Sequence, residues 1–193
     1  MSSELSKSRR VLVEAIKGSV FPELRLRAFS EISRGKEPGI IGNFSRLRAD
    51  GGYDVISLDL DEKKRPQFHA IIGCVDAKGL IYPWGESIPA NQVTALFLLT
   101  RVFVQKRGRG VLSLILPRWF GHAFFGFTPR EDAAFNQQAA VTACAEFVAC
   151  LDQAERWWRT GELGPNLVEA SMVLRDPNTG NTSVAGAERK ESA

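Results

Sequence analysis

Several classes of protein are excluded by what this chain of 193 residues has little of. Its longest stretch without Asp, Glu, Lys or Arg runs from Ser87 to Thr100, whereas a helix needs about 20 mostly apolar residues to cross a bilayer. The basic cluster Lys7 to Arg10 precedes an apolar stretch that Glu14 and Lys17 interrupt, so it does not form a signal-peptide core. We therefore expect a cytoplasmic protein that does not associate with a membrane.

Cysteine and histidine are scarce, which limits disulfide, zinc and catalytic chemistry. The three cysteines form no CxxC pair and lie inside apolar runs, so we expect buried, unreactive thiols at Cys74, Cys144 and Cys150. A structural zinc site needs four ligands, and the histidine nearest to any cysteine is His69, on the same predicted strand as Cys74. We predict no metal and no cofactor.

Enzyme motifs are missing as well. The sequence has no GxGxxG after a strand, no GxxxxGK[ST], no HExxH and no GxSxG. Its two histidines are far apart in the chain, so the common hydrolase and metal constellations have few residues to draw on. We identify no catalytic residue, and the sequence favours a non-catalytic protein over an enzyme.

The residues that are present indicate one globular domain with a tail. A hydrophobic share of 44% with 24% charged residues is typical of a chain that buries a substantial core. After Ala170 the residues are small or polar and include no aromatics, and such a segment does not offset the entropy lost on ordering. We predict a single α+β domain over residues 1–170 and a disordered tail over 171–193.

The first half of the chain predicts a helix followed by a β-meander. Apolar residues recur at helical spacing from Glu4 to Lys17, and Gly18 is the expected stop. Alternating segments follow at 40–48, 53–60 and 67–75, separated by turns at Asp50-Gly51-Gly52 and before Pro66. We expect three consecutive antiparallel strands, with a fourth short strand at 80–82.

Residues 87–106 permit two interpretations. Pro89 at a helix start and apolar residues on one helical face favour a helix, which we take as the prediction. However, Leu98, Leu99 and Val102 leave the opposite face apolar too, as in a strand buried on both sides. A strand is then expected over 111–116, followed by an aromatic-rich loop or strand to Phe127.

A long C-terminal helix completes the predicted fold. Thr128 as the cap, Pro129 as the first helical residue and Glu131 as its partner match a capping box, and Gly161 is the expected stop. An apolar stripe runs through this helix from Val141 to Trp158. The sequence thus predicts an α+β fold, a mostly antiparallel sheet covered by an N-terminal helix and a long C-terminal helix.

Charge is distributed unevenly along the chain, although the formal net charge is only +3. Residues 87–130 include six basic residues and no acidic one. Clustered cations attract anionic groups, so this segment is a candidate surface for a partner, carried by Arg101, Lys106, Arg107 and Arg109. The simpler interpretation is a solvated turn, which the shortness of the charge run favours.

An aromatic stretch just before the long helix is the first candidate ligand site. Flat apolar side chains, a cation and a group that titrates near neutral pH lie together in Arg118, Trp119, His122 and Phe124. The alternative, which we consider the more common reason for such a stretch, is that these aromatics pack beneath the end of the helix.

His69 forms a second candidate with Asp59 and Asp61, because the predicted turn at 61–66 brings the three together. A carboxylate can orient an imidazole as a general base, and the group can hold a divalent metal. The neighbouring run of charges, from Asp61 to Arg65, favours an exposed charged hairpin instead.

The order of these elements resembles a family of small bacterial proteins of unknown function. The resemblance covers about the first 80 residues and rests on Phe21-Pro22-Glu23-Leu24, Phe29, Phe44-Ser45-Arg46 and Phe68 to Gly73, with Trp157-Trp158 similar in character. The family is a single-domain α+β fold, and some relatives lie near polymorphic-toxin immunity genes. The resemblance implies a binding or neutralising role and transfers no catalytic residue.

The sequence as a whole predicts a non-catalytic cytoplasmic protein that binds a protein partner, of the immunity or accessory type. One alternative is a small-ligand-binding protein or minor enzyme with a pocket around Trp119 and His122. The other is nucleic-acid binding through the basic segment from Arg101 to Arg118, which matches no known nucleic-acid-binding motif.

Overall fold

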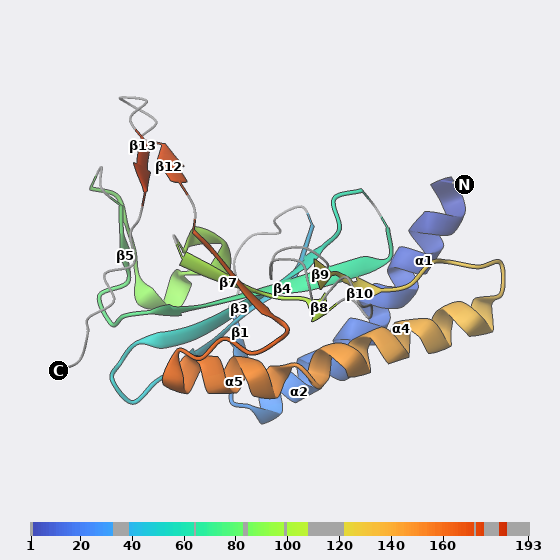
Figure 1. The fold of residues 1–193 in the computed structure, drawn as a ribbon, viewed down its shortest axis with the longest axis horizontal. Coiled ribbons are helices and arrows are strands. Elements are labelled where there is room, and N and C mark those ends of the chain that lie inside the picture. Colours follow the sequence, from blue (N-terminus) through green and yellow to red (C-terminus); the bar gives the residue numbers. More distant parts are fainter. Residues whose placement is uncertain are drawn as a thin grey trace.

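A computed structural model of the chain shows an α+β fold in which helices cover one face of an antiparallel sheet (Figure 1). The structure describes residues 2–32, 39–63, 65–82, 85–98, 100–107, 122–171, 173–175 and 182–184. The strands of the main sheet follow the order β1-β2-β3-β4-β7-β11, and β10 pairs with the beginning of β4. The predicted fold class is confirmed.

The elements are as follows. The main sheet consists of β1 (Ser30–Glu31), β2 (Ile40–Leu47), β3 (Tyr53–Leu60), β4 (Gln67–Val75), β7 (Thr100–Val104), β10 (Phe125–Gly126) and β11 (Leu167–Ser171). Separate two-stranded ladders pair β5 (Leu80–Ile81) with β6 (Ser87–Ile88), β8 (Lys106–Arg107) with β9 (His122–Ala123), and β12 (Val173–Arg175) with β13 (Thr182–Val184). The helices are α1 (Ser2–Ala15), α2 (Phe21–Leu26), α4 (Ala133–Val148) and α5 (Leu151–Thr160), with a π-helical turn η1 (Ile16–Val20) and 3₁₀ turns η2 (Ala90–Gln92) and η3 (Ala95–Phe97).

The meander of β2, β3 and β4 forms as the alternation predicts. Phe44 pairs with Ile56, and Ile56 pairs with Ile72, so three fully buried side chains lie side by side on one face of the sheet. At the β2–β3 turn, Gly51 adopts a φ of 83°, and the Asp50 carboxylate accepts a hydrogen bond from the Gly52 amide at 2.9 Å. A glycine with positive φ and an Asp that bonds two residues ahead are the usual chemistry of such a turn.

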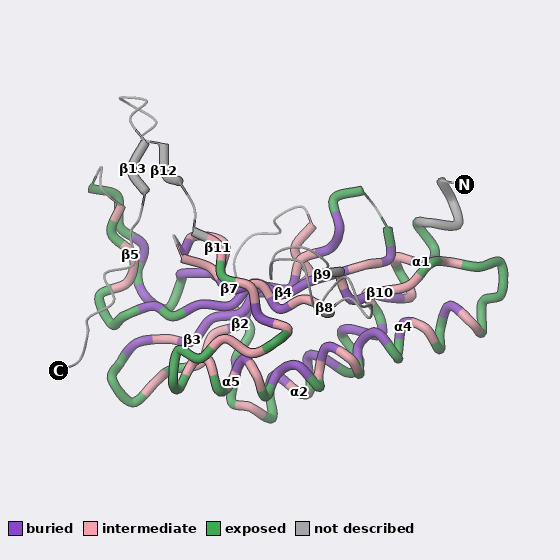
Figure 2. The backbone as a smooth tube through the Cα atoms, in the orientation of Figure 1, coloured by how far each residue is buried: buried purple, intermediate pink, exposed green. Residues whose placement is uncertain are grey.

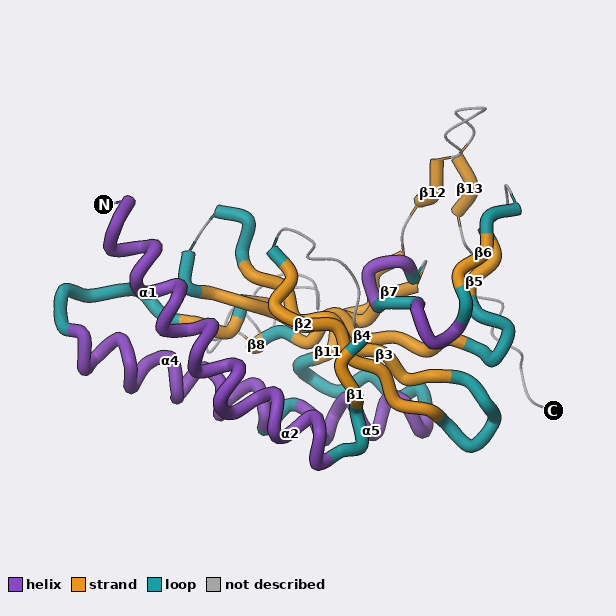
Figure 3. The backbone as a smooth tube through the Cα atoms, turned by 180° about the vertical axis from the view of Figure 1, so that it is seen from behind, coloured by secondary structure: helices purple, strands orange, loops and turns teal. Residues whose placement is uncertain are grey.

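The two faces of the sheet are covered differently. Helices α1, α2, α4 and α5 lie on the same side of the sheet in both Figure 1 and Figure 3, and they enclose the larger apolar core, which includes Phe44, Phe68 and Phe147. Residues 88–98 cover part of the opposite face over Val55 and Ile71. Figure 2 shows that the buried residues follow the central strands and the inner sides of the helices.

The predicted helix over 87–106 is wrong, because this segment folds into short 3₁₀ turns and the strand β7. Within β7, Val102 and Val104 are buried in the core beneath the helices, while Phe103 packs on the opposite face. Apolar residues on both sides are what a central strand requires, and β-branched residues favour it. The predicted strand at 111–116 lies outside the described residues.

The N-terminal helix is confirmed, but it does not stop at Gly18. The helical backbone continues through η1 into α2, where Pro22 lies in the first turn and Leu24 is fully buried. Proline donates no backbone hydrogen bond to the preceding turn, and Pro22 lies just after the π-helical turn, where the regular helical bonding pattern is already interrupted. The apolar side chains of Ile16 and Val20 keep this segment on the core.

The C-terminal helix begins four residues later than the predicted cap Thr128 requires. Asp132 is the N-cap, and its carboxylate accepts hydrogen bonds from the amides of Ala134 at 2.8 Å and Phe135 at 3.2 Å. A turn at 149–150 divides the helix into α4 and α5, and Gly161 ends it with a φ of 73°, as predicted. Val141 is 46% exposed and does not belong to the buried stripe.

The remaining predictions concern the short elements and the cysteines. The expected strand at 80–82 exists as β5, although it pairs with β6 outside the main sheet. Cys144 and Cys150 are buried as expected, whereas Cys74 is exposed. Among the described residues, no helix is both long and apolar enough to span a membrane.

The last strand of the main sheet, β11, was not predicted. It pairs with β7 from Leu167 to Ser171 and ends where we placed the domain boundary. Beyond it, β12 and β13 pair with each other, and the rest of the predicted tail lies outside the described residues.

Candidate ligand-binding site

The strand β4 changes its neighbour at His69. Residues 70–72 of β4 pair with β7, while Phe68 and Gln67 pair with β10. On the other side of β4, His69 pairs with Asp59 of β3, as the sequence analysis proposed. The imidazole therefore lies where three elements of the sheet meet.

His69 is a buried, neutral histidine between two aromatic rings. Its residue is 8% exposed, and the ring centroids of Phe124 and Phe103 lie 4.8 Å and 5.4 Å from the imidazole centroid. Burial lowers the pKa of His69 to about 4, and the nearby charge of Asp61 offsets only part of this. The imidazole is therefore uncharged at neutral pH.

The hydrogen-bonding capacity of this imidazole is largely unused. Nδ1 is buried without a hydrogen-bond partner in the part of the chain that the structure describes. Nε2 lies 3.9 Å from Oδ2 of Asp59, which is too far for a direct hydrogen bond. Buried polar atoms of native proteins are usually paired, so an unpaired buried nitrogen calls for a ligand, a water molecule or strain as its explanation.

A cavity of about 290 Å³ opens beside this histidine. It is lined by Asp59, Leu60, Asp61, Glu62, Lys63, Arg65, His69 and Phe124. A space of this size is at the small end of typical ligand pockets. Most of the lining is polar or charged, and Leu60 and Phe124 supply its apolar walls.

The charged groups of this cavity differ in whether they are already paired. Arg65 donates two hydrogen bonds to the Asp61 carboxylate, at 2.8 Å and 2.9 Å, so these charges neutralise each other. Arg9 of α1 donates to the Asp61 carbonyl at 3.0 Å. Asp59 forms no hydrogen bond with another described side chain, and burial raises its pKa, with the Glu62 carboxylate raising it further.

Only part of the predicted aromatic site lies within the described residues. Phe124 lies in the cavity against His69, whereas Arg118 and Trp119 lie outside the described residues. The backbone of His122 belongs to β9 and pairs with Arg107 of β8. The structure thus joins Phe124 to the His69, Asp59 and Asp61 group, which the sequence analysis treated as a separate candidate.

Two of the four predicted partner-binding cations have partners inside the protein. Lys106 forms an ion pair with Glu146 of α4, with distances of 2.6 Å and 2.7 Å to the two carboxylate oxygens. Arg101 donates hydrogen bonds to the carbonyls of Leu98, at 2.9 Å, and Leu96. Arg107 lies in β8, and Arg109 lies outside the described residues.

A second cavity of about 300 Å³ lies between β10 and α4. The Lys106–Glu146 pair is at its wall, together with Phe127 and Phe135. Because Lys106 and Glu146 already have each other as partners, the described lining of this cavity presents no unpaired charge to a ligand.

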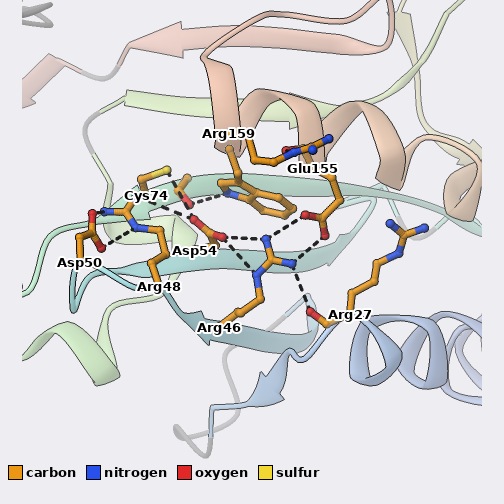
Figure 4. Close-up of polar contacts among 10 residues, drawn as sticks. Arg27, Arg46, Arg48, Asp50, Asp54, Cys74, Glu155 and Arg159 are labelled. Atoms are coloured by element: carbon orange, nitrogen blue, oxygen red, sulfur yellow. Dashed lines mark hydrogen bonds and ion pairs between the residues drawn. The ribbon is translucent and has the colours of Figure 1, made fainter.

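The most extensive charged cluster of the described chain surrounds Arg46 (Figure 4). Its guanidinium donates to Asp54 of β3 at 2.7 Å and 3.2 Å, to Glu155 of α5 at 2.8 Å and 3.0 Å, and to the Arg27 carbonyl at 3.2 Å. The same guanidinium lies 4.6 Å from the ring centroid of Phe29 and 5.4 Å from that of Trp158.

This Arg46 cluster holds the C-terminal helix on the sheet. Trp158 extends it by donating from Nε1 to the Gly73 carbonyl at 3.0 Å. Every guanidinium nitrogen of Arg46 already makes a hydrogen bond within the protein, so Arg46 offers no donor to a ligand. We interpret it as structural.

No metal centre emerges from these groups. Within the described ranges, no three His, Cys, Asp or Glu side chains converge as ligands for a metal ion. The divalent-metal alternative for His69, Asp59 and Asp61 therefore has no support from the geometry.

The burial of His69 differs from the exposed charged hairpin that the sequence favours. The charged run from Asp61 to Arg65 does form a polar turn, as expected, but His69 shares its face of β4 with Ile71, and β4 is buried on both faces. That spacing was visible in the sequence. The aromatic neighbours were not, because Phe103 lies in β7 and Phe124 lies between β9 and β10, both distant from His69 in the chain.

The comparisons with known proteins identify no relative. No family model matches the chain, and searches of curated proteins and of solved structures found no match.

Proposed function

We propose that this protein binds a small organic ligand in the cavity beside His69. The observation that carries the proposal is the buried neutral imidazole, whose Nδ1 has no partner among the described residues and whose Nε2 faces Asp59 across 3.9 Å at the cavity wall. A ligand atom that hydrogen-bonds to both Nε2 and Oδ2 fits that separation, because two hydrogen bonds of about 2.8 Å span it.

This proposal keeps the small-ligand alternative that the sequence predicts, but it places the binding site elsewhere in the chain. The site moves from Trp119 and His122 to His69 and Asp59, and it retains Phe124 as an aromatic wall. It assigns no reaction, because no nucleophile stands beside the imidazole in the described cavity.

Ligand-induced thermal stabilisation tests this function. A library of small metabolites that spans cationic, neutral and anionic compounds is screened against the wild-type chain, and we expect at least one compound to raise the melting temperature. His69→Gln and Phe124→Ala are expected to lose that shift, since each removes a wall or a hydrogen-bonding group of the cavity. Phe135→Ala serves as the matched control, because Phe135 lines the other cavity.

A screen with no stabilising compound would contradict the proposal. A shift that survives in His69→Gln and Phe124→Ala but disappears in Phe135→Ala would place the ligand in the second cavity instead. Circular dichroism of each variant establishes that it is folded before its shift is interpreted.

Binding of a protein partner through the basic segment stays a separate proposal, in keeping with the immunity-type role that the family resemblance implies. It rests on the absence of acidic residues from 87–130. Pull-down from the native host at physiological salt is its test, and recovery of no protein would count against it. Retention on DNA or RNA that falls steeply with salt would favour nucleic-acid binding instead.

A further inference from the structure

The cavity beside His69 also indicates what kind of ligand it takes, an inference that rests on the proposed function. Its walls carry three carboxylates against two cations, Lys63 and Arg65. Arg65 donates two hydrogen bonds to Asp61, so these two charges balance each other. Of the remaining charged lining residues, Asp59 and Glu62 are negative and Lys63 is positive. The lining therefore has an excess of negative charge.

Among the described residues, Asp59 has no ion-pair partner other than His69, at 3.9 Å. It is partly buried, with 22% of its side chain exposed, and the charges of Glu62 and Asp61 both raise its pKa. The Arg9 charge lowers its pKa, yet burial keeps the pKa of Asp59 above its usual value. A positive group beside Oδ2 would stabilise the ionised form.

The neutral imidazole of His69 selects the same kind of group. In the tautomer that carries its proton on Nδ1, the ring would present a lone pair at Nε2, which accepts a hydrogen bond but donates none. An ammonium group has donors only, and it can donate to Nε2 and to Asp59 Oδ2 at once. A carboxylate or phosphate in that position would meet the Asp59 charge instead.

The remaining walls are suited to an apolar body. Phe124 and Leu60 line the cavity, and the Phe124 ring lies 4.8 Å from the imidazole. A flat ring or short hydrocarbon attached to the amine would cover these side chains. We propose that the cavity binds a small primary amine with an aromatic or apolar body, its ammonium group between Asp59 and His69.

A charge series of one scaffold tests this inference. Benzylamine, benzyl alcohol and benzoate share a phenyl ring and carry positive, neutral and negative groups at pH 7.5. Titration calorimetry on the full chain is expected to give the tightest binding for benzylamine, with benzyl alcohol at least tenfold weaker and benzoate weaker still. Benzylamine binding should weaken as salt is added, whereas benzyl alcohol binding should not.

Substitutions of the carboxylates test which group recognises the charge. Asp59→Asn is expected to weaken benzylamine at least tenfold while it changes benzyl alcohol less than threefold. Glu62→Gln, at an exposed position of the wall, should weaken benzylamine by about threefold without affecting the fold. Asp76→Asn is the matched control, because Asp76 lies at an exposed turn outside the cavity and its Oδ1 accepts from the Lys78 amide, a bond that Asn retains.

Several outcomes would overturn the inference. One is benzyl alcohol or benzoate binding as tightly as benzylamine, and another is benzylamine binding that Asp59→Asn and Glu62→Gln leave unchanged. Failure of all three probes also overturns it. In each case, a neutral or anionic compound from the metabolite screen whose stabilisation depends on His69 would leave the proposed function intact and refute only the amine class. If Asp59→Asn fails to fold, Glu62→Gln and the salt dependence decide.

Discussion

At the scale of single residues, burial determines the charge state of His69. A histidine in water has a pKa of 6.5, and burial in this sheet lowers the value to about 4. The unfolded chain therefore takes up a proton at a higher pH than the folded chain does. The stabilising effect of the neutral native imidazole is fully present above pH 6.5 and is lost as the pH falls from there through about 4.

This predicts a pH-dependent stability that one substitution removes. Between pH 7.5 and pH 4.5 the His69 contribution to the free energy of unfolding should fall by about 2 to 3 kcal/mol. Urea denaturation of the wild-type chain and of His69→Gln at both values measures this contribution as the difference between the two proteins. Equal losses in both would show that the imidazole titrates normally in the folded state.

A second effect at this scale concerns Arg46. Its charge stabilises the fold because its two carboxylate partners, Asp54 and Glu155, are largely shielded from water. Asp54 has only 5% of its side chain exposed, and burial raises its pKa even though Arg46 lies beside it. Removing the arginine leaves Asp54 and Glu155 near each other without a shared cation. A buried charge that has lost its partner is costly.

We expect Arg46→Ala to lower the free energy of unfolding by about 3 kcal/mol. Arg46→Lys should recover only part of the loss, because an ammonium group cannot bond two carboxylates in parallel or stack on Trp158 as a guanidinium does. Arg48→Ala is the comparison, since Arg48 bonds the exposed Asp50 and approaches Asp54 only to 3.9 Å, and it should cost less than about 1 kcal/mol. Similar losses in Arg46→Ala and Arg48→Ala would contradict a structural role for the Arg46 cluster.

At the scale of elements, the start of the C-terminal helix depends on which side chain reaches the free amides. Both Thr128 and Asp132 are residues that cap helices, and the sequence favoured Thr128 because of the proline and the glutamate after it. In the fold, Asn136 bonds the backbone of Arg130 at both its N–H, at 2.9 Å, and its carbonyl, at 2.6 Å. This side chain holds the preceding segment outside the helix.

The two caps make opposite predictions for paired alanine substitutions. Asp132→Ala should lower the free energy of unfolding by about 1 kcal/mol, because two helix amides lose their acceptor. Thr128→Ala should change it by less than about 0.5 kcal/mol. Chemical denaturation monitored by circular dichroism measures both, and a larger effect at Thr128 would restore the earlier helix start.

The strand β7 shows why one element was assigned to the wrong class. Its apolar residues satisfy a helical period and also fill both faces of a strand, so periodicity alone does not distinguish the two. The choice depends on neighbours, since β4 and β11 provide hydrogen-bonding partners on its two edges. Those partners lie more than 25 residues away in the chain on either side.

At the scale of the whole molecule, the end of the folded domain is defined by the last strand of the main sheet. Leu167 of β11 is 1% exposed and pairs with Val104, so it belongs to the core. The next strands, β12 and β13, pair with each other in a separate ladder. We therefore predict that the domain over residues 1–170 needs β11 but not the residues after Ser171.

Two shortened chains test this boundary. A chain that ends at Ser171 should keep the free energy of unfolding of the full protein to within about 0.5 kcal/mol. A chain that ends at Asn166 should lose at least about 3 kcal/mol, because it removes the buried Leu167 and exposes the edge of β7. A large loss in the first chain would show that the tail contributes to the domain.

Much of this fold was predictable from the sequence because it depends on short-range patterns. Short runs of alternating apolar residues and a Gly-containing turn predict the β2–β3–β4 meander. Gly161 predicts the end of the C-terminal helix, because glycine readily adopts the left-handed conformation that it has there. The candidate site was predictable only in fragments. His69 with Asp59, and Phe124 with the aromatic stretch, were recognised as separate features, because sequence separation hides that Phe124 lies beside His69.

The sequence by itself determined which residues alternate, which turns form and where charge is concentrated, since these follow from local backbone and side-chain preferences. Tertiary structure alone decided that β7 is a strand, that Lys106 and Arg101 are paired internally, and that His69 is a neutral group in a partly acidic cavity. The physical reason is that hydrogen-bond partners, burial and pKa depend on groups from distant segments, and only folding brings those groups together.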